Sequence, residues 1–336
     1  MSAPARHAET DQRRLSMLRS ACEGAVRAAL DADDVIEILA NPDGSIWIER
    51  AGRGIEIEPS TITAAARERI IRLVASSIGE ACDRSAPIIS AELTGSGERF
   101  QGLLPPVSEA PCFAIRKSAT VPFKLDDYVD QGALAPATAT ALRAALDSRA
   151  NILIAGGTSS GKTTFTNALL AEPSLSDERI VLLEDTRELK CAAANAVSLR
   201  THRDRITLTD LVRSTMRLRP DRIVVGEVRG PEALDLLKAW NTGHPGGITT
   251  LHANSARAAL QRLEQLAMEA ATVPPRALIA ESIDVVLFMS RQGGKRCVEE
   301  AISVSGFDGD AYITAPLVSR SLSLVSEAVV TQGDKS

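Results

Sequence analysis

The segment NILIAGGTSSGKTT, residues 151–164, decides the fold of this chain. It opens with a short apolar run, a pattern typical of a strand buried in a parallel sheet. Gly156 and Gly157 interrupt that strand, and the Gly-Lys-Thr triplet at 161–163 completes the spacing G-x-x-x-x-G-K-[ST]. Apolar residues at helical spacing follow over 163–171. The segment therefore predicts a strand, a phosphate-binding loop and a helix in direct succession.

Each residue type in this loop has a chemical reason. Glycines let successive backbone N–H groups point into one concavity, and the positive end of the helix dipole adds to the attraction for phosphate. We expect Lys162 to bridge the β- and γ-phosphates of ATP and the Thr163 hydroxyl to take one position on Mg²⁺. The expected nucleotide-binding residues of the loop are Gly156, Gly157, Thr158, Ser159, Ser160, Gly161, Lys162, Thr163 and Thr164. The alternative is a glycine-rich loop that only turns the chain.

Composition bounds the class of protein. A chain of 336 residues is long enough for two domains, and 44% hydrophobic with 3% aromatic residues predicts aliphatic cores. A net charge of −5 argues against a surface that binds nucleic acid over its whole extent. The five cysteines are scattered and include no C-x-x-C pair, which predicts reduced thiols and no zinc site.

Location is predicted from what the sequence does not contain. We expect a cytoplasmic protein, because no apolar signal core and no run approaching about 20 apolar residues is found. Residues 9–30 have the pattern of a basic amphipathic helix. Such a helix binds either a membrane surface or its own domain. The pattern favours docking on its own domain and leaves peripheral membrane association open.

The first third of the chain predicts a small α+β domain over 1–117. Thr61 is expected to cap a helix that runs to about Cys82. The expected strands are 35–39, 45–49, 54–57, 88–93, 99–104 and 112–116. Residues 118–135, with Pro122 and two adjacent aspartates, are expected to be a linker.

Residues 136–336 predict a second, larger domain in which strands and helices alternate. Such alternation is typical of a mostly parallel sheet with helices on both faces. The expected strands are 151–155, 179–183, 222–225, 247–251 and 284–289, with a terminal antiparallel hairpin over 296–304 and 312–318. The expected helices are 137–147, 163–171, 208–218, 231–241, 256–270 and 275–281.

Two of the expected strands end in carboxylates. Ligands of open parallel sheets bind beyond the carboxyl ends of the strands, so these side chains are candidates for the site. Glu184 and Asp185 follow the strand 179–183, and one of them could polarise an attacking water. Glu227 follows the strand 222–225, where a carboxylate holds Mg²⁺ through water. The alternative for each is a solvated strand end.

Three further side chains are candidates near the phosphates. Arg229 lies two residues beyond Glu227 and could either compensate phosphate charge or pair with Glu232. Two of the four histidines, His244 and His252, flank a glycine-rich turn and a threonine pair. His252 follows the expected strand 247–251, where an imidazole could bond the γ-phosphate.

Four motifs occur in one order: GGTSSGKTT (156–164), LLEDTREL (182–189), LRPDRIVVGEVRGPEA (218–233) and TGHPGGITTLHANS (242–255). Together they resemble the Walker A, Asp-box, Walker B and His-box of the secretion-superfamily ATPases. Those proteins drive type IV secretion, conjugation, type II secretion and type IV pili. RFQGLLPPV (99–107) and CFAIRKSATVPFKLDDYV (112–129) resemble the end of the family's N-terminal domain and its linker. The compact length and the absence of a four-cysteine module are most like the conjugal-transfer group of the TrbB type.

The resemblance implies a RecA-like ATPase domain in a homohexameric ring, with nucleotide held between the two domains. By motif match it implies that Glu184 is the catalytic carboxylate, Glu227 the Walker B residue, and His244 and His252 the His-box pair. Arg116 matches a family position near the nucleotide. Glu184 and Asp185 both fit the acidic position, so their division of roles, including a contact of Asp185 with the metal, stays open.

The sequence thus predicts a Mg²⁺-dependent ATPase that powers conjugative DNA transfer or type IV secretion from the inner face of the membrane. Its expected partners are further copies of itself and membrane components of the apparatus, without sequence-specific nucleic acid binding. Three alternatives remain: a type IV pilus motor, a nucleic-acid-stimulated RecA-like motor, and a nucleotide-gated scaffold with little turnover.

Overall fold

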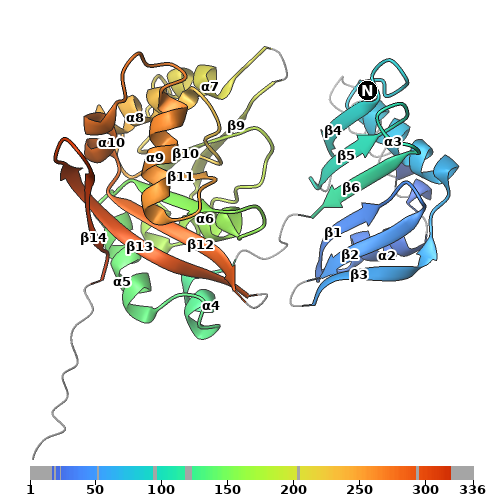
Figure 1. Cartoon of the computed structure of the whole chain (residues 1–336), viewed down its shortest axis with the longest axis horizontal. Coiled ribbons are helices and arrows are strands. Elements are labelled where there is room, and N and C mark those ends of the chain that lie inside the picture. The colour runs from blue at the N-terminus through green and yellow to red at the C-terminus, as the bar shows by residue number, and fades with distance from the viewer. Residues whose placement is uncertain are drawn as a thin grey trace, which may run out of the picture.

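The computed structural model describes residues 17–18, 20–22, 24–50, 53–93, 97–117, 123–202, 205–292 and 295–318. Two sheets, each with its own helices, lie side by side along the long axis of the molecule (Figure 1). Within the described ranges, no helix has both the length and the apolar character needed to cross a membrane.

The N-terminal domain is a six-stranded sheet in the order β3-β2-β1-β6-β5-β4. Its strands are β1 (Val35–Ala40), β2 (Ser45–Arg50), β3 (Gly54–Thr61), β4 (Ile88–Glu92), β5 (Arg99–Leu103) and β6 (Cys112–Arg116). All neighbouring strands in it are antiparallel. Helices α2 (Gly24–Asp31) and α3 (Ala64–Ser77) pack on one face around a shared apolar core. The opposite face is left to meet the second domain.

Two details of this domain differ from expectation. Thr61 ends strand β3, and Thr63 caps α3 instead, where its side chain accepts a hydrogen bond from Ala66 N at 3.2 Å. The helix expected over 9–30 is not continuous: residues 20–21 are helical, Cys22 lies in a bend, and α2 begins at Gly24 with a φ of +61°. Most of the basic residues of that expected helix lie outside the described residues.

The C-terminal domain is an eight-stranded sheet in the order β14-β13-β12-β7-β11-β10-β8-β9. Its strands are β7 (Ile152–Gly156), β8 (Arg179–Glu184), β9 (Asn195–Arg200), β10 (Arg222–Val225), β11 (Ile248–Leu251), β12 (Val285–Gln292), β13 (Lys295–Phe307) and β14 (Tyr312–Pro316). The six strands from β12 to β9 are parallel, and β13 and β14 add antiparallel pairs at one edge. Strand β9 was missed by the sequence prediction.

Helices cover both faces of this sheet, as the alternation predicts (Figure 1). They are α4 (Leu125–Asp130), α5 (Pro136–Asp147), α6 (Lys162–Leu170), α7 (Leu208–Thr215), α8 (Glu232–Asn241), α9 (Ala256–Ala267) and α10 (Arg276–Ser282). Alternate residues of β7 enter opposite cores: Leu153 packs with α7–α10, and Ile154 packs with α4–α6. The central strands are therefore buried on both faces, which explains their continuous apolar runs.

The stretch expected as a linker contains a packed helix. Leu125 and Tyr128 of α4 lie in the core of the second domain, and the Tyr128 ring meets Phe165 of α6 edge to face at 5.0 Å. A helix of six residues is too short to show a strong apolar period, which is why the sequence predicts a linker here. At least residues 125–130 belong structurally with the eight-stranded sheet.

Asn151 ties the amino ends of neighbouring strands together. Its side-chain oxygen accepts hydrogen bonds from Gly246 N and Gly247 N, both at 2.8 Å, and its side-chain nitrogen donates to Ser282 O at 2.7 Å. The asparagine is 4% exposed, so water cannot replace these bonds. The Trp240 indole packs against the same turn. A Cβ at Gly247 would stand 2.1 Å from the indole nitrogen, so no side chain fits at Gly247.

We predict that Asn151→Ala lowers the free energy of unfolding of the C-terminal domain by about 2–4 kcal/mol, because three buried backbone groups lose their partner. Urea unfolding followed by Trp240 fluorescence in a Trp47→Phe background measures it. Thr140→Ala on α5, which removes one exposed hydrogen bond, is the control. Equal midpoints for Asn151→Ala and the control would contradict the structural role of Asn151.

Candidate functional site

The four motifs meet at one edge of the eight-stranded sheet. Strands β7, β8, β10 and β11 are mutually parallel, so their carboxyl ends lie together. β7 leads into the phosphate loop, and the other three end at Glu184, at Gly226-Glu227 and shortly before His252. This edge faces the N-terminal domain, and side chains of the two domains form ion pairs across the boundary.

The phosphate loop is closely fitted at its glycines. A Cβ at Gly156 would stand 2.5 Å from both Met289 O and Ser160 Oγ, so no side chain fits there. Gly161, which precedes α6, has a φ of +95°, a conformation that favours glycine. Ser159 adopts a φ of +60°, and its carbonyl accepts a hydrogen bond from Arg296 Nε at 3.2 Å. These constraints explain the glycine positions of the motif.

Lys162 begins α6 and is 8% exposed. Its ammonium donates to Gly156 O and Gly157 O, both at 3.0 Å, and lies 3.3 Å from His252 Nδ1. Burial lowers the pKa of Lys162, and the positive charges of Arg116 and Arg229 act in the same direction while Glu227 opposes them. The lysine is thus held inside the loop, within reach of both positive and negative side chains.

A chain of polar contacts leads from Lys162 through His252 and Glu227 to Arg229. His252 Nε2 lies 2.8 Å from Glu227 Oε1, and the other oxygen of Glu227 accepts from Arg229 Nε at 2.9 Å. The imidazole of His252 therefore lies between the Lys162 ammonium and the Glu227 carboxylate. The structure therefore brings together the expected Walker A lysine, Walker B carboxylate and one His-box histidine.

Arg229 makes the bond to Glu227 through its side chain, while its backbone N–H donates to Glu232 at 2.7 Å. The side-chain pairing with Glu232 that the sequence allowed is not formed. The guanidinium also lies 3.7 Å from Asp185 and is 56% exposed, so it stays at the open side of the site.

Glu184 is the buried carboxylate of the site, at 4% exposure. Its Oε1 accepts hydrogen bonds from Glu188 N and Leu189 N, both at 2.8 Å. Its Oε2 is buried and has no hydrogen-bond partner among the described residues. Burial raises the pKa of Glu184 to about 7, although the two backbone bonds act against that rise. A carboxylate whose pKa lies near neutrality has the character of a general base.

Asp185 lies just beyond the end of β8, and its surroundings differ from those of Glu184. Its side chain is 43% exposed, accepts from Thr201 Oγ1 at 3.1 Å and faces Arg229. The two carboxylates that the sequence could not separate thus have different surroundings, one enclosed and one solvated.

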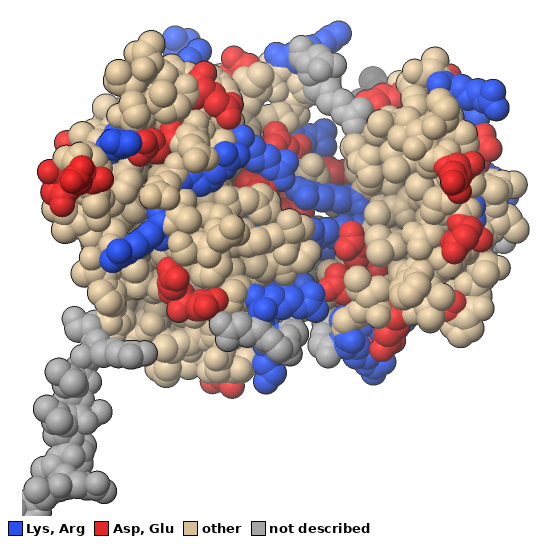
Figure 2. All heavy atoms as spheres, viewed as in Figure 1, with Lys and Arg blue, Asp and Glu red and all other residues tan. Residues whose placement is uncertain are grey.

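The N-terminal domain presents a row of charges to this edge. Strand register aligns Glu49, Glu37, Arg116, Arg99 and Glu92 across five strands on the face without helices. The charge of Arg116 reaches Lys162, as its effect on the lysine pKa shows. Figure 2 shows Lys and Arg side chains gathered along the boundary between the two domains.

Several residues at this boundary were missed by sequence reasoning. Arg99 forms an ion pair with Glu188 at 2.9 Å, and Glu92 accepts from Arg187 N at 2.8 Å and from Arg200 at 2.9 Å. The only signal available was the alternation of polar and apolar residues along the expected strands 88–93 and 99–104. Such alternation is also typical of an ordinary solvated sheet face.

Two arginines of the β12–β13 hairpin make a second link. Arg291 and Arg296 approach the buried Glu49 of β2 at 3.8 and 3.9 Å, and Arg296 also bonds the phosphate loop. No motif marks either arginine in the sequence.

His244 lies apart from these residues. It precedes β11 and therefore sits near the amino ends of the strands, beside the turn that Asn151 binds. His252 follows the same strand at the opposite edge. The expected pair of histidines is thus divided, and within one chain His244 does not join the nucleotide-binding residues.

The residues at the carboxyl edge fit a nucleoside triphosphate with Mg²⁺. Ser160 Oγ and Glu184 Oε2 are buried polar atoms without a partner in the described parts of the chain, which is unusual unless a ligand supplies one. Thr163 at the start of α6 and Glu227 supply the oxygen ligands that Mg²⁺ takes beside phosphate oxygens and water. In the described ranges no cluster of three or more acidic, histidine or cysteine side chains suggests another metal centre.

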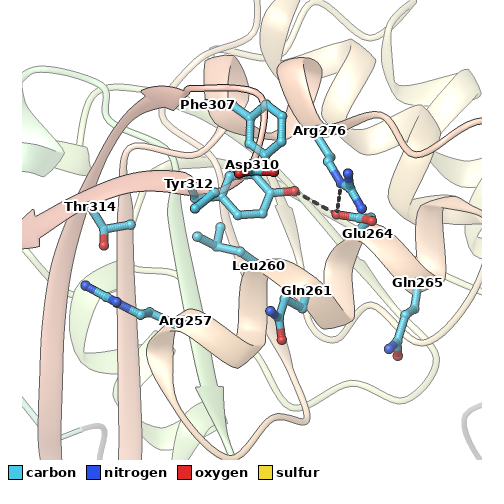
Figure 3. Close-up of a pocket in the computed structure, with 11 residues that line it drawn as sticks. Arg257, Leu260, Gln261, Glu264, Gln265, Arg276, Phe307, Asp310, Tyr312 and Thr314 are labelled. Atoms are coloured by element: carbon cyan, nitrogen blue, oxygen red, sulfur yellow. Dashed lines mark hydrogen bonds and ion pairs between the residues drawn. The ribbon is translucent and has the colours of Figure 1, made fainter.

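A second hollow of about 430 Å³ lies elsewhere, between α9 and the β13–β14 hairpin (Figure 3). Glu264 at its wall accepts from Arg276 at 3.0 Å and from the Tyr312 hydroxyl at 3.3 Å. It includes no residue of the four motifs, so the hollow is separate from the candidate site.

Comparison with known proteins agrees with the geometry. The family described as Type II/IV secretion system protein matches residues 33–316. The conjugal transfer protein TrbB of Rhizobium radiobacter is 50% identical over 288 residues, which cover 85% of this chain and 88% of that protein. The type IV secretion system protein VirB11 of Bartonella henselae is 30% identical over 317 residues, covering 81% and 88%.

A solved structure shows a similar fold. The pilus retraction motor PilT with bound ADP aligns with a TM-score of 0.56 over 86% of this chain and 80% of its own, at 17% identity. The expected arrangement, an α+β N-terminal domain before a RecA-like domain, is confirmed.

We predict that Glu184→Gln stabilises the nucleotide-free protein at pH 8 by about 1–3 kcal/mol. Burial raises the pKa of Glu184 to about 7 from an ordinary value of 4.5, so the native state favours the protonated form. The stability that this group contributes is therefore fully present below pH 4.5 and is lost as pH rises through 7. The gain should shrink toward pH 5.

Thermal melting at pH 8 and pH 5, with Glu109→Gln on the exposed surface as control, measures this difference. A gain that is equal at both pH values, or no gain at pH 8, would show that Glu184 is not an enclosed carboxylate.

Proposed function

The chain belongs to the Type II/IV secretion system protein family, and on that premise we propose that it is a Mg²⁺-dependent ATPase that powers conjugative DNA transfer or type IV secretion. The observation that carries the proposal is the meeting of a phosphate loop with one enclosed carboxylate of raised pKa, Glu184, and one ion-paired carboxylate, Glu227. Different surroundings give the two groups different roles.

We assign Glu184 as the general base of hydrolysis. Its ionised carboxylate accepts a proton from the water that attacks the γ-phosphorus of ATP, and the β–γ bridging oxygen leaves with ADP. The Glu188 and Leu189 N–H groups hold one oxygen of the carboxylate and leave Oε2 to accept the proton. The position of Asp185 in solvent supports this division of roles.

Positive groups around the loop balance the charge of the triphosphate. Lys162, Arg116 and Arg229 approach from the loop, the N-terminal domain and the end of β10. Backbone N–H groups of residues 157–164 supply neutral donors. Mg²⁺ held by Thr163 and Glu227 would supply further electrostatic stabilisation of the β- and γ-phosphates. His252, between Lys162 and Glu227, is placed to respond when the γ-phosphate is lost.

The conjugal-transfer relative at 50% identity supports transfer of DNA as the work performed. We propose a homohexameric ring at the inner face of the cytoplasmic membrane, docked on membrane components of a secretion apparatus. In such a ring His244, which lies away from the site of its own chain, is free to contact a neighbouring copy.

We predict that Lys162→Ala lowers the rate of ATP hydrolysis by about 10²–10³, the effect of removing one preorganised donor to phosphate. Phosphate release with saturating ATP and Mg²⁺ measures the rate. Lys238→Ala, an exposed lysine of α8, is the matched control and should hydrolyse ATP at the rate of the unmodified chain.

A mating assay connects hydrolysis to transfer. In a donor that lacks its own copy of the gene, the unmodified chain and Lys238→Ala should restore plasmid transfer, and Lys162→Ala should not. Normal transfer with Lys162→Ala would refute the motor role. Restoration of pilus retraction without any restored transfer would favour the pilus alternative.

We predict a ring in solution when ATP and Mg²⁺ are present. Mass measurement should show about six times the 35.7 kDa of one chain, because the likeness to secretion ATPases implies a homohexameric ring. A monomer at every concentration tested would count against the ring and leave the single-chain site unaffected.

A further inference from the structure

Asn167 is a buried polar residue of α6 that none of the motifs includes. It lies five residues after Lys162, on the helix that starts at the phosphate loop, and it is 7% exposed. Its side-chain nitrogen donates to Glu188 O at 3.0 Å, and its side-chain oxygen accepts from Lys190 N at 2.8 Å. Both polar atoms of the amide are therefore used on the loop that follows Glu184.

One of these bonds acts on the same peptide unit that holds the carboxylate. The carbonyl of Glu188 and the N–H of Leu189 belong to one peptide group, and in a trans peptide they point in opposite directions. Asn167 holds the carbonyl end, while the N–H end donates to Glu184 Oε1 at 2.8 Å. A hydrogen bond at one end of a peptide group polarises the other end and fixes its plane.

We propose that Asn167 is a positioning residue that sets the orientation of Glu184 through the Glu188–Leu189 peptide. The inference rests on the proposed function, in which Glu184 is the base. It connects the phosphate loop and the base through one rigid helix, because Lys162 and Asn167 are both on α6. A shift of the loop on its phosphates would thereby be carried to the carboxylate.

The loop is held from its other side by the N-terminal domain. Glu92 accepts from Arg187 N at 2.8 Å, and Arg99 pairs with Glu188 at 2.9 Å. These contacts are more exposed than the Asn167 bonds, since the Glu188 and Glu92 side chains are 21% and 18% exposed. Asn167 is thus the enclosed anchor of the loop.

Amide exchange and kinetics of the full chain with ATP and Mg²⁺ test the proposal together. Asn167→Leu removes both bonds, and Asn167→Asp keeps the acceptor for Lys190 N but loses the donor to Glu188 O. Both variants should exchange the Leu189 amide faster. Both should lower kcat about tenfold, while KM for ATP changes less than about threefold, because Asn167 touches no loop atom that faces nucleotide.

Two further variants separate positioning from simple loss of packing. Thr215→Val removes an equally buried hydrogen bond on α7, distant in sequence, and should leave kcat unchanged. In a Glu184→Gln background, Asn167→Leu should cause no further loss, because residues that act as one unit are not additive.

An unchanged Leu189 exchange rate, an unchanged kcat in Asn167→Leu, or fully additive losses with Glu184→Gln would each overturn the positioning role. These outcomes are distinct from failure of the proposed function. If the unmodified chain hydrolyses no ATP, or Glu184→Gln hydrolyses it normally, the assignment of the base fails, and the exchange of Leu189 alone then decides whether Asn167 holds the peptide.

Discussion

Enclosure of the Glu184 carboxylate is the constraint on which the rest of the site depends. An ionised carboxylate at 4% exposure is costly unless hydrogen bonds replace water, and only one of its oxygens has them. Both donors come from the backbone of the loop that follows, so the loop must keep one shape for the carboxylate to stay in place. The ties at Asn167 and Glu92 are consequences of that requirement.

The N-terminal domain also helps to hold the loop that encloses Glu184. Its helix-free sheet face carries a row of charged side chains. Those that contact the C-terminal domain do so at segments that support the proposed site. Arg99 and Glu92 contact the loop after Glu184, and Glu49 faces the hairpin whose Arg296 bonds the phosphate loop. Movement of this domain would loosen both supports together. The two-domain architecture is therefore part of the geometry of the proposed site.

The parts of the site that depend on a short run of residues could be predicted from the sequence. The loop at 156–164, the strand ends at Glu184 and Glu227, and the position of His252 each follow from a short apolar run and the residue after it. Asn167 and Arg296 could not be found this way, because an asparagine in a helix and an arginine in a hairpin are ordinary until the fold brings a partner to them. His244 and His252 are close in sequence, but strand β11 lies between them and places them at opposite edges of the sheet.

The same reasoning explains why α4 and Asp185 were unclear in the sequence. A six-residue helix spans fewer than two turns, so its period is too short to recognise, and only the packing of Leu125 and Tyr128 identifies it. Glu184 and Asp185 are chemically alike and adjacent. Burial separates them, and burial depends on how β8 faces β10, a property of the assembled sheet.

Side chains of both charges surround Lys162 at the proposed nucleotide site. Its ammonium is held by two carbonyls, and its pKa is lowered by burial and by Arg116 and Arg229. Glu227 opposes this effect but is itself shared with Arg229 and His252. A triphosphate bound at the loop would lie between positive side chains of both domains, because Arg116 belongs to the N-terminal domain and Lys162 to the C-terminal domain. Attraction between the triphosphate and these side chains would therefore add to the contacts that hold the two domains together.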